Sequence, residues 1–179
     1  MKIALFGGSF DPPHNGHEAI IKEALNTLDI DKLIIMPTFV SPFKDKTSAD
    51  EKQRFSWVQK LWGNLEKVEI SSYEIEQKRP VPSIESVEYL SQIYKPEKFY
   101  LLIGADHLSS LHLWHHFEKL ASLVEFVIAK RDDIEIPKQF KDLNTKVKIS
   151  SSFIRSNLNT NEVCEKIKEE VKKYYLQKN

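Results

Sequence analysis

Apolar residues along this chain fall into short runs separated by longer amphipathic stretches. The short runs predict strands at Lys2–Phe6, Lys32–Met36, Val68–Ser71, Phe99–Ile103, Val124–Ala129 and Val147–Ile149. The amphipathic stretches predict helices near residues 16–28, 50–61, 83–93, 106–120, 151–158 and 162–175. Such alternation is typical of a mostly parallel sheet that helices cover on both faces. We therefore predict a doubly wound α/β fold, with residues 1–179 forming a single domain.

The turn after the first predicted strand carries the first candidate chemistry. Residues 7–17 read GGSFDPPHNGH, and a predicted helix follows. Gly7 and Gly8 have no Cβ, so a ligand can approach the backbone closely. The free N–H groups at a helix start attract an anion, and His14 and His17, three positions apart, can face one crevice. The pattern predicts a phosphate site, with an exposed proline-rich turn as the plainer alternative.

A second phosphate-binding element is predicted towards the end of the chain. Residues 149–155 read ISSSFIR and follow a predicted strand. Serine hydroxyls at a helix start either cap free N–H groups or contact an anion, and alone this run is more typical of a cap. Arg155 adds a planar, permanently charged group that matches phosphate oxygens. Doubly wound sheets bind ligands beyond the carboxyl ends of their strands, where both elements are expected.

Composition favours a small-molecule ligand. Twenty-six Lys and Arg balance twenty-six Asp and Glu, so no basic excess favours nucleic acid or a membrane surface as a partner. Cys164 is the single cysteine, which excludes an intrachain disulfide. The sequence shows neither a signal peptide nor an apolar run of membrane-spanning length. We expect a cytoplasmic protein that binds a small anionic substrate, and assembly into a homo-oligomer is compatible with the sequence.

The middle of the chain supplies candidates for a second ligand. Asp106 follows a predicted strand, where its carboxylate could accept hydrogen bonds from a ribose. Trp114 lies eight residues later, on nearly the same face of the predicted helix, although core packing is the plainer interpretation of this residue. His112, His115 and His116 could offer two zinc ligands, but no third ligand stands at metal spacing, which favours solvated or packing histidines.

These motifs resemble those of the nucleotidyltransferase superfamily. GGSFDPPHNGH is similar to its GxFDPxHxGH signature, and ISSSFIR to its ISSTxIR element. The stretch GADHLSSLHLWHHFEKL resembles the GADxLxxLxxW stretch of nicotinate-nucleotide adenylyltransferases, and the resemblance extends over nearly the whole chain. Pro42-Phe43-Lys44 resembles the PHK loop of that family, with Phe43 where histidine is usual, and VPSIESV at 81–87 departs from its SYTxDTL pattern. The resemblance implies a Rossmann-like fold.

The same resemblance implies a reaction and a set of residue roles. The adenylyl group of ATP would pass to the 5′-phosphate of nicotinate mononucleotide, forming nicotinate adenine dinucleotide and pyrophosphate in NAD biosynthesis. His17 and His14 would be catalytic, because they would contact the ATP phosphates and stabilise the developing charge. The rest of the ATP site would comprise Gly8, Ser9, Phe10, Arg131, Ser151, Ser152 and Arg155. The acceptor site would comprise Lys44, Ser83, Asp106 and Trp114. Mg²⁺ would be the cofactor, carried by the ATP phosphates without a metal site on the protein.

Three other functions stay open at this point. Pantetheine-phosphate adenylyltransferase of coenzyme A biosynthesis shares the superfamily motifs and an ISSS element. A cytidylyltransferase of the superfamily would prefer CTP, although its RTxGIST-type element is not found in the sequence. A non-catalytic nucleotide-binding protein could retain the phosphate site without turnover, but the presence of His14, His17, Ser151 and Arg155 favours an enzyme.

Overall fold

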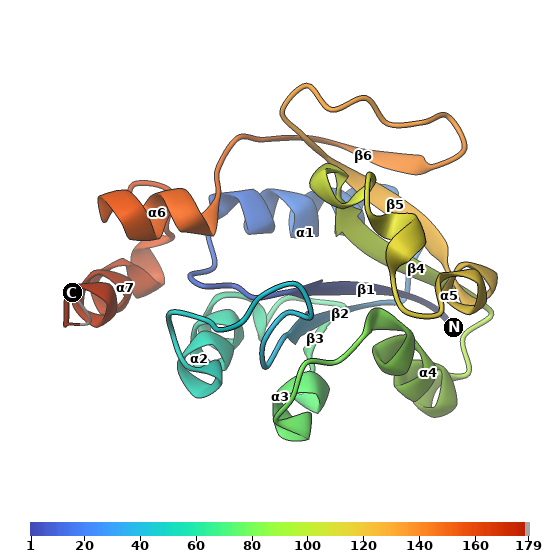
Figure 1. The fold of residues 1–179 in the computed structure, drawn as a ribbon, viewed down its shortest axis with the longest axis horizontal. Coiled ribbons are helices and arrows are strands. Elements are labelled where there is room, and N and C mark those ends of the chain that lie inside the picture. Colours follow the sequence, from blue (N-terminus) through green and yellow to red (C-terminus); the bar gives the residue numbers. More distant parts are fainter. Residues whose placement is uncertain (178–179) are drawn as a thin grey trace.

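The computed structural model describes residues 1–177 and is built on one six-stranded sheet (Figure 1). The strands are β1 (Lys2–Gly8), β2 (Lys32–Pro37), β3 (Val68–Ile70), β4 (Lys98–Gly104), β5 (Glu125–Arg131) and β6 (Lys141–Val147). The α-helices are α1 (Asn15–Thr27), α2 (Glu51–Trp62), α3 (Tyr73–Gln77), α4 (Ser83–Tyr94), α5 (Phe117–Leu123), α6 (Ser151–Asn157) and α7 (Glu165–Gln177). The strand order is β3-β2-β1-β4-β5-β6, and every neighbouring pair is parallel.

Helices bury both faces of this sheet, which confirms the predicted doubly wound, Rossmann-like architecture. Ala4 and Phe6 of β1 belong to the core beneath α1, α2, α6 and α7, whereas Ile3 and Leu5 belong to the core beneath α4 and α5. Successive strand residues point to opposite faces, so a strand that is covered on both sides must be apolar throughout. This requirement explains the continuous apolar runs by which the central strands were predicted.

The predicted helix at 106–120 is wrong. Two 3₁₀ turns, η1 (Ala105–His107) and η2 (Leu111–Leu113), occupy its first half, and α5 begins only at Phe117. Leu108, Leu111 and Trp114 pack against the α4–α5 core at a spacing of three residues, which is the repeat of a 3₁₀-helix rather than of an α-helix. Asp106 lies in η1 and Trp114 follows η2, so the predicted α-helical face that would carry both residues does not exist.

Two further expectations need correction at the ends of the sheet. The last strand is β6, which ends where the predicted strand Val147–Ile149 was expected to begin. Within residues 141–145 of this edge strand only Leu143 and Thr145 are buried, and most of the strand's residues are polar. The short helix α3 was not predicted at all, because five residues carry too little periodicity.

The strand order reverses between β1 and β4, and this reversal positions the site. From β1 the chain first adds β2 and β3 on one side, and then crosses to β4, β5 and β6 on the other. The helices that follow β1 and β4 therefore diverge to opposite faces, which leaves a crevice beyond the carboxyl ends of these two strands. Among residues 1–177, no helix is both long enough and apolar enough to cross a membrane.

Candidate active site

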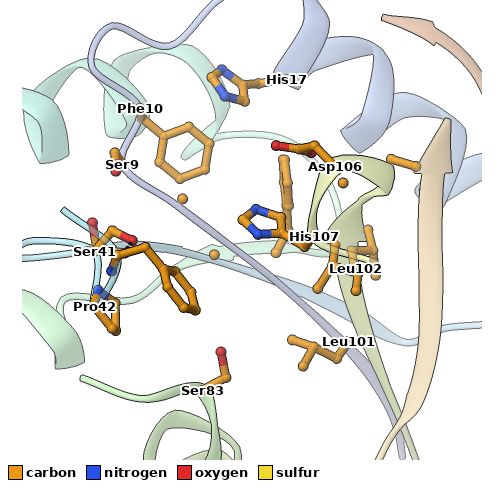
Figure 2. A pocket seen from close by; sticks show the side chains of 18 of the residues that line it. Ser9, Phe10, His17, Ser41, Pro42, Ser83, Leu101, Leu102, Asp106 and His107 are labelled. Atoms are coloured by element: carbon orange, nitrogen blue, oxygen red, sulfur yellow. Dashed lines mark hydrogen bonds between the residues drawn. The ribbon is translucent and has the colours of Figure 1, made fainter. Parts of the chain in front are cut away.

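A cavity of about 720 Å³ opens at this crevice, within the usual range for small-molecule sites. Figure 2 shows Ser9, Phe10 and His17 at one end of the cavity, Ser83 at the other, and Asp106 with His107 between them. Every site residue predicted from sequence except Arg155 lines it, namely Gly8, Ser9, Phe10, His14, His17, Lys44, Ser83, Asp106, Trp114, Arg131, Ser151 and Ser152. The fold thus brings residues from six separate segments to one place.

The two histidines of the first motif are fixed by the start of α1. His14 is the N-cap, and its Nδ1 accepts hydrogen bonds from the backbone N–H groups of Gly16 (3.0 Å) and His17 (3.4 Å). In return, the Nδ1 of His17 accepts from the backbone N–H of His14 at 3.1 Å. The two rings stack with centroids 3.7 Å apart. Because both Nδ1 atoms accept, each neutral ring carries its proton on Nε2.

Burial keeps both imidazoles neutral in the free protein. It lowers the pKa of His14 to about 4, with a smaller contribution from the positive charge of Arg131. Burial also places the pKa of His17 well below its ordinary value, and His14, Arg131 and Lys44 lower it further. At neutral pH the two side chains are therefore neutral Nε2–H donors and carry no positive charge.

Phe10 contributes its backbone to the cavity and its side chain to the core. Its φ of 49° lies in the left-handed region, which turns the ring inward, where it is only 1% exposed. The ring packs edge-on against His17 (4.8 Å between centroids) and Trp62 (5.8 Å). The phenylalanine of the motif thus packs against the His17 ring and helps to fix its position, a role that the sequence did not indicate.

Asp11 ties the first motif to two distant segments. Its buried carboxylate accepts hydrogen bonds from the backbone N–H groups of Ser48 (2.7 Å) and Ala49 (2.8 Å) and from the Tyr175 hydroxyl (2.5 Å). Arg155 lies 3.7 Å away as an ion pair. The aspartate therefore holds the loop before α2 and the helix α7 against the motif, and its function is structural.

Arg54 of α2 is a second buried charge that sequence reasoning missed. The side chain is 0% exposed. Its guanidinium donates to the backbone carbonyls of Ser9 (2.7 Å), Thr38 (2.7 Å), Phe39 (2.7 Å) and Ala49 (3.0 Å). These carbonyls belong to the loop after β1 and to the loop that connects β2 to α2. One side chain thus fixes two loops around the cavity, which the polar and apolar pattern of α2 does not reveal.

The second motif packs directly on the first. Ser150 is the N-cap of α6 and accepts from the Phe153 N–H at 3.1 Å, so the expected capping role falls on this serine. Ser151 Oγ donates to the Pro12 carbonyl at 2.8 Å. Arg155 lies outside the cavity lining and donates to the Asp11 carbonyl (2.6 Å) and to Ser152 Oγ (3.3 Å). In this structure Arg155 therefore joins the two motifs.

The candidate acceptor residues come from the loop after β2, from the start of α4, where Ser83 lies, and from the segment after β4. Lys44 Nζ donates to Ser9 Oγ at 3.3 Å, which brings the β2 loop over the first motif. Asp106 forms a 3.3 Å ion pair with Arg131, although we expected these two residues to serve different substrates. A Cβ on Gly104 would lie 2.5 Å from Asp106 Oδ1, so a larger residue at this strand end would require the Asp106 carboxylate to shift.

Glu74 is a buried carboxyl in the cavity wall that sequence reasoning also missed. One oxygen accepts from Ser86 Oγ at 2.7 Å, and the other has no hydrogen-bond partner among the described residues. Burial raises its pKa to about 7, with a smaller contribution from the negative charge of Glu85. No signal in the sequence marks this residue, because its burial depends on the unpredicted helix α3.

No resident metal site is found within residues 1–177, where no three His, Cys, Asp or Glu side chains are grouped to hold an ion. His112 and the pair His115–His116, which we considered as zinc ligands, are exposed residues in the region of the 3₁₀ turns.

Known proteins resemble this chain over its full length. A family model described as cytidylyltransferase-like matches residues 5–157. Chains named "Probable nicotinate-nucleotide adenylyltransferase" are 75% identical in Campylobacter jejuni subsp. jejuni serotype O:6, covering 100% of both chains, and 55% identical in Campylobacter fetus subsp. fetus, covering 100% of this chain and 99% of the relative. A Plasmodium falciparum nicotinic acid mononucleotide adenylyltransferase solved with NaAD is 22% identical, covers 99% of this chain and 96% of its own, and has a TM-score of 0.73, which supports the fold. The chain therefore belongs to the cytidylyltransferase-like family and, within it, to the nicotinate-nucleotide adenylyltransferases.

Proposed function

We propose that this chain transfers the adenylyl group of ATP to the 5′-phosphate of nicotinate mononucleotide, releasing pyrophosphate and forming nicotinate adenine dinucleotide. The observation that carries the proposal is one cavity, at the strand-order reversal, that is lined by residues from each of the three sequence motifs. The full-length identity to the Campylobacter chains supports the same reaction.

The two ends of the cavity suit the two substrates. At one end, backbone groups of Gly8, Ser9 and Phe10 lie beside the Nε2–H donors of His14 and His17, and we assign the ATP triphosphate there. Arg131, Ser151 and Ser152 extend this site. Arg155 supports it through its hydrogen bonds to the Asp11 carbonyl and to Ser152 Oγ. The acceptor would be held by Ser83 at the other end, by Trp114 and Asp106, and by Lys44, which contacts Ser9.

The chemistry requires positioning and charge stabilisation. An oxygen of the acceptor phosphate attacks the α-phosphorus of ATP in line, and the bond to the pyrophosphate oxygen breaks. A phosphate monoester is largely dianionic at neutral pH and needs no general base. Neutral Nε2–H groups, fixed by the α1 cap, would donate to the phosphate oxygens as negative charge moves onto the leaving group. Mg²⁺ would arrive on the ATP phosphates as part of the substrate.

Pyrophosphate release tests the proposal. The protein is given Mg·ATP with nicotinate mononucleotide, its amide analogue or phosphopantetheine, each offered separately, with a matched reaction containing EDTA. We expect release with the acid mononucleotide, much slower release with the amide, and none with EDTA. Release only with phosphopantetheine would assign the chain to coenzyme A synthesis, and ATP binding without release would favour a non-catalytic nucleotide-binding protein.

A further inference from the structure

Two loops on opposite sides of the cavity meet through aromatic rings. Phe43 lies on the loop after β2, while His107 and Trp114 lie on the segment after β4. The Phe43 ring centroid is 5.9 Å from that of Trp114 and 6.2 Å from that of His107. The His107 and Trp114 centroids are 5.7 Å apart. All three side chains line the cavity, and together they form one aromatic cluster in its wall.

Phe43 contributes little to the fold itself. Its side chain is 61% exposed, and it belongs to neither core, whereas Trp114 packs against the α4–α5 core. A single exposed phenylalanine on a surface needs no explanation. Phe43, however, lies beside two other rings in the lining of the cavity, so a ligand that binds between the two loops would cover its exposed ring.

The geometry suits a flat ring with positive charge. The planes of Phe43 and Trp114 are inclined by 39°. A ring inserted between two aromatic faces at contact distance separates their centroids by about 7 Å, so the Phe43 loop would need to move outward by about 1 Å. Aromatic faces are negative, and several of them around one space attract a cation.

We propose that Phe43, with His107 beside it, covers the face of the acceptor's pyridinium ring opposite Trp114 and so acts as a specificity residue for a cationic ring. The inference rests on the proposed function, because nicotinate mononucleotide carries a pyridine whose nitrogen is bonded to ribose and is permanently positive. Phosphopantetheine carries no such ring, so the same cluster would discriminate against it.

The position of Phe43 determines which kinetic constant it controls. The pyridinium ring is unchanged between substrate, transition state and product, so a contact to it strengthens binding equally in all three. Removing the contact should therefore raise the KM for the acceptor and leave kcat and the KM for Mg·ATP unchanged. A structural role in holding the β2 loop would instead alter the ATP constants through Lys44, which contacts Ser9.

The test compares Phe43→Leu, which keeps an apolar side chain and removes the aromatic face, with Phe153→Leu. Phe153 is a phenylalanine of similar exposure, 54%, which lies on α6 outside the cavity lining. We expect Phe43→Leu to raise the KM for nicotinate mononucleotide about five- to twenty-fold, the range of a desolvated cation–π contact. The Phe153→Leu control should match the wild type in every constant.

A binding measurement separates this inference from the proposed function. Trp57 and Trp62 are at most 1% exposed, so quenching of tryptophan fluorescence reports mainly on Trp114. Phe43→Leu should weaken the quenching titration with nicotinate mononucleotide by the same factor, but not the titration with its dihydro form, whose ring nitrogen carries no charge. An unchanged KM and an unchanged titration in an active enzyme would overturn the specificity role of Phe43 and leave the proposed function intact. Wild type without turnover on nicotinate mononucleotide would overturn the proposed function.

Discussion

Arg54 offers a direct test of how the cavity is held open. The side chain is fully buried and donates to four backbone carbonyls on two loops. Methionine has a similar length and no donor, so Arg54→Met would leave those carbonyls without their present partner. Lysine keeps the charge but not the planar fork, so Arg54→Lys would satisfy fewer of them.

The magnitude follows from the number and kind of hydrogen bonds lost. A hydrogen bond to a charged group contributes about 1.5–3 kcal/mol, but neighbouring bonds are not additive. We therefore expect Arg54→Met to lower the free energy of unfolding by about 4 kcal/mol and Arg54→Lys by about 2 kcal/mol. For a chain of this size the larger value corresponds to a fall in Tm of about 8–16 °C.

Urea unfolding followed by circular dichroism measures the stability, and initial rates below the lowered Tm measure the KM for Mg·ATP. Because Arg54 holds the Ser9 carbonyl in the proposed triphosphate site, the KM should rise in both variants. Lys52→Met, on the exposed side of the same helix, is the control and should change stability by less than about 0.5 kcal/mol. Arg54→Met with the stability of that control would refute the reasoning.

Three other predictions concern single side chains. His17→Ala should lower kcat by about 10²–10³-fold with an unchanged circular dichroism spectrum, because a fixed donor to the transferring phosphate is lost; near-normal turnover would remove His17 from catalysis. Tyr175→Phe should lower the free energy of unfolding by about 1.5–3 kcal/mol, since the hydroxyl bonded to the buried Asp11 carboxylate disappears, and an unchanged urea midpoint would show that this bond contributes nothing. Burial raises the pKa of Glu74 to about 7, above its ordinary 4.5. Between these two pH values the folded state retains a proton that the unfolded state releases. The free energy of unfolding therefore falls as the pH rises from 4.5 to about 7. Glu74→Gln should therefore be more stable than the wild type by up to about 3 kcal/mol at pH 8 and similar at pH 4; an equal difference at both pH values would contradict the assignment.

The central strands of the sheet and the positions of the two motifs could be predicted, because both depend on the local pattern of apolar and polar residues. Central strands such as β1 and β4 are buried on both faces and read as unbroken apolar runs. The two motifs follow strands, and parallel strands present their carboxyl ends at one edge, so the residues of both motifs had to meet there. The β6 strand and the 3₁₀ turns escaped prediction because an edge strand is polar and a three-residue repeat resembles an amphipathic helix.

The interior charges could not be predicted, because their burial is decided by tertiary contacts. Arg54 stands in an ordinary helical sequence, yet the loops after β1 and β2 fold over it and supply its acceptors. Asp11 belongs to a recognised motif, but its partners come from 37, 38 and 164 positions away. A sequence motif shows which residues are required and leaves open whether they contact the substrate or hold the residues that do.

This distinction changes how the first motif is understood. Burial and the nearby positive charge of Arg131 keep His14 and His17 neutral while the cavity holds no anion. A triphosphate would offset the same positive charge, so the field that lowers both pKa values would weaken when ATP binds. The protein therefore avoids assembling several unpaired cations in a buried site before its substrate arrives. Fixed neutral donors, held by backbone caps and by the buried groups behind them, provide phosphate recognition without that cost.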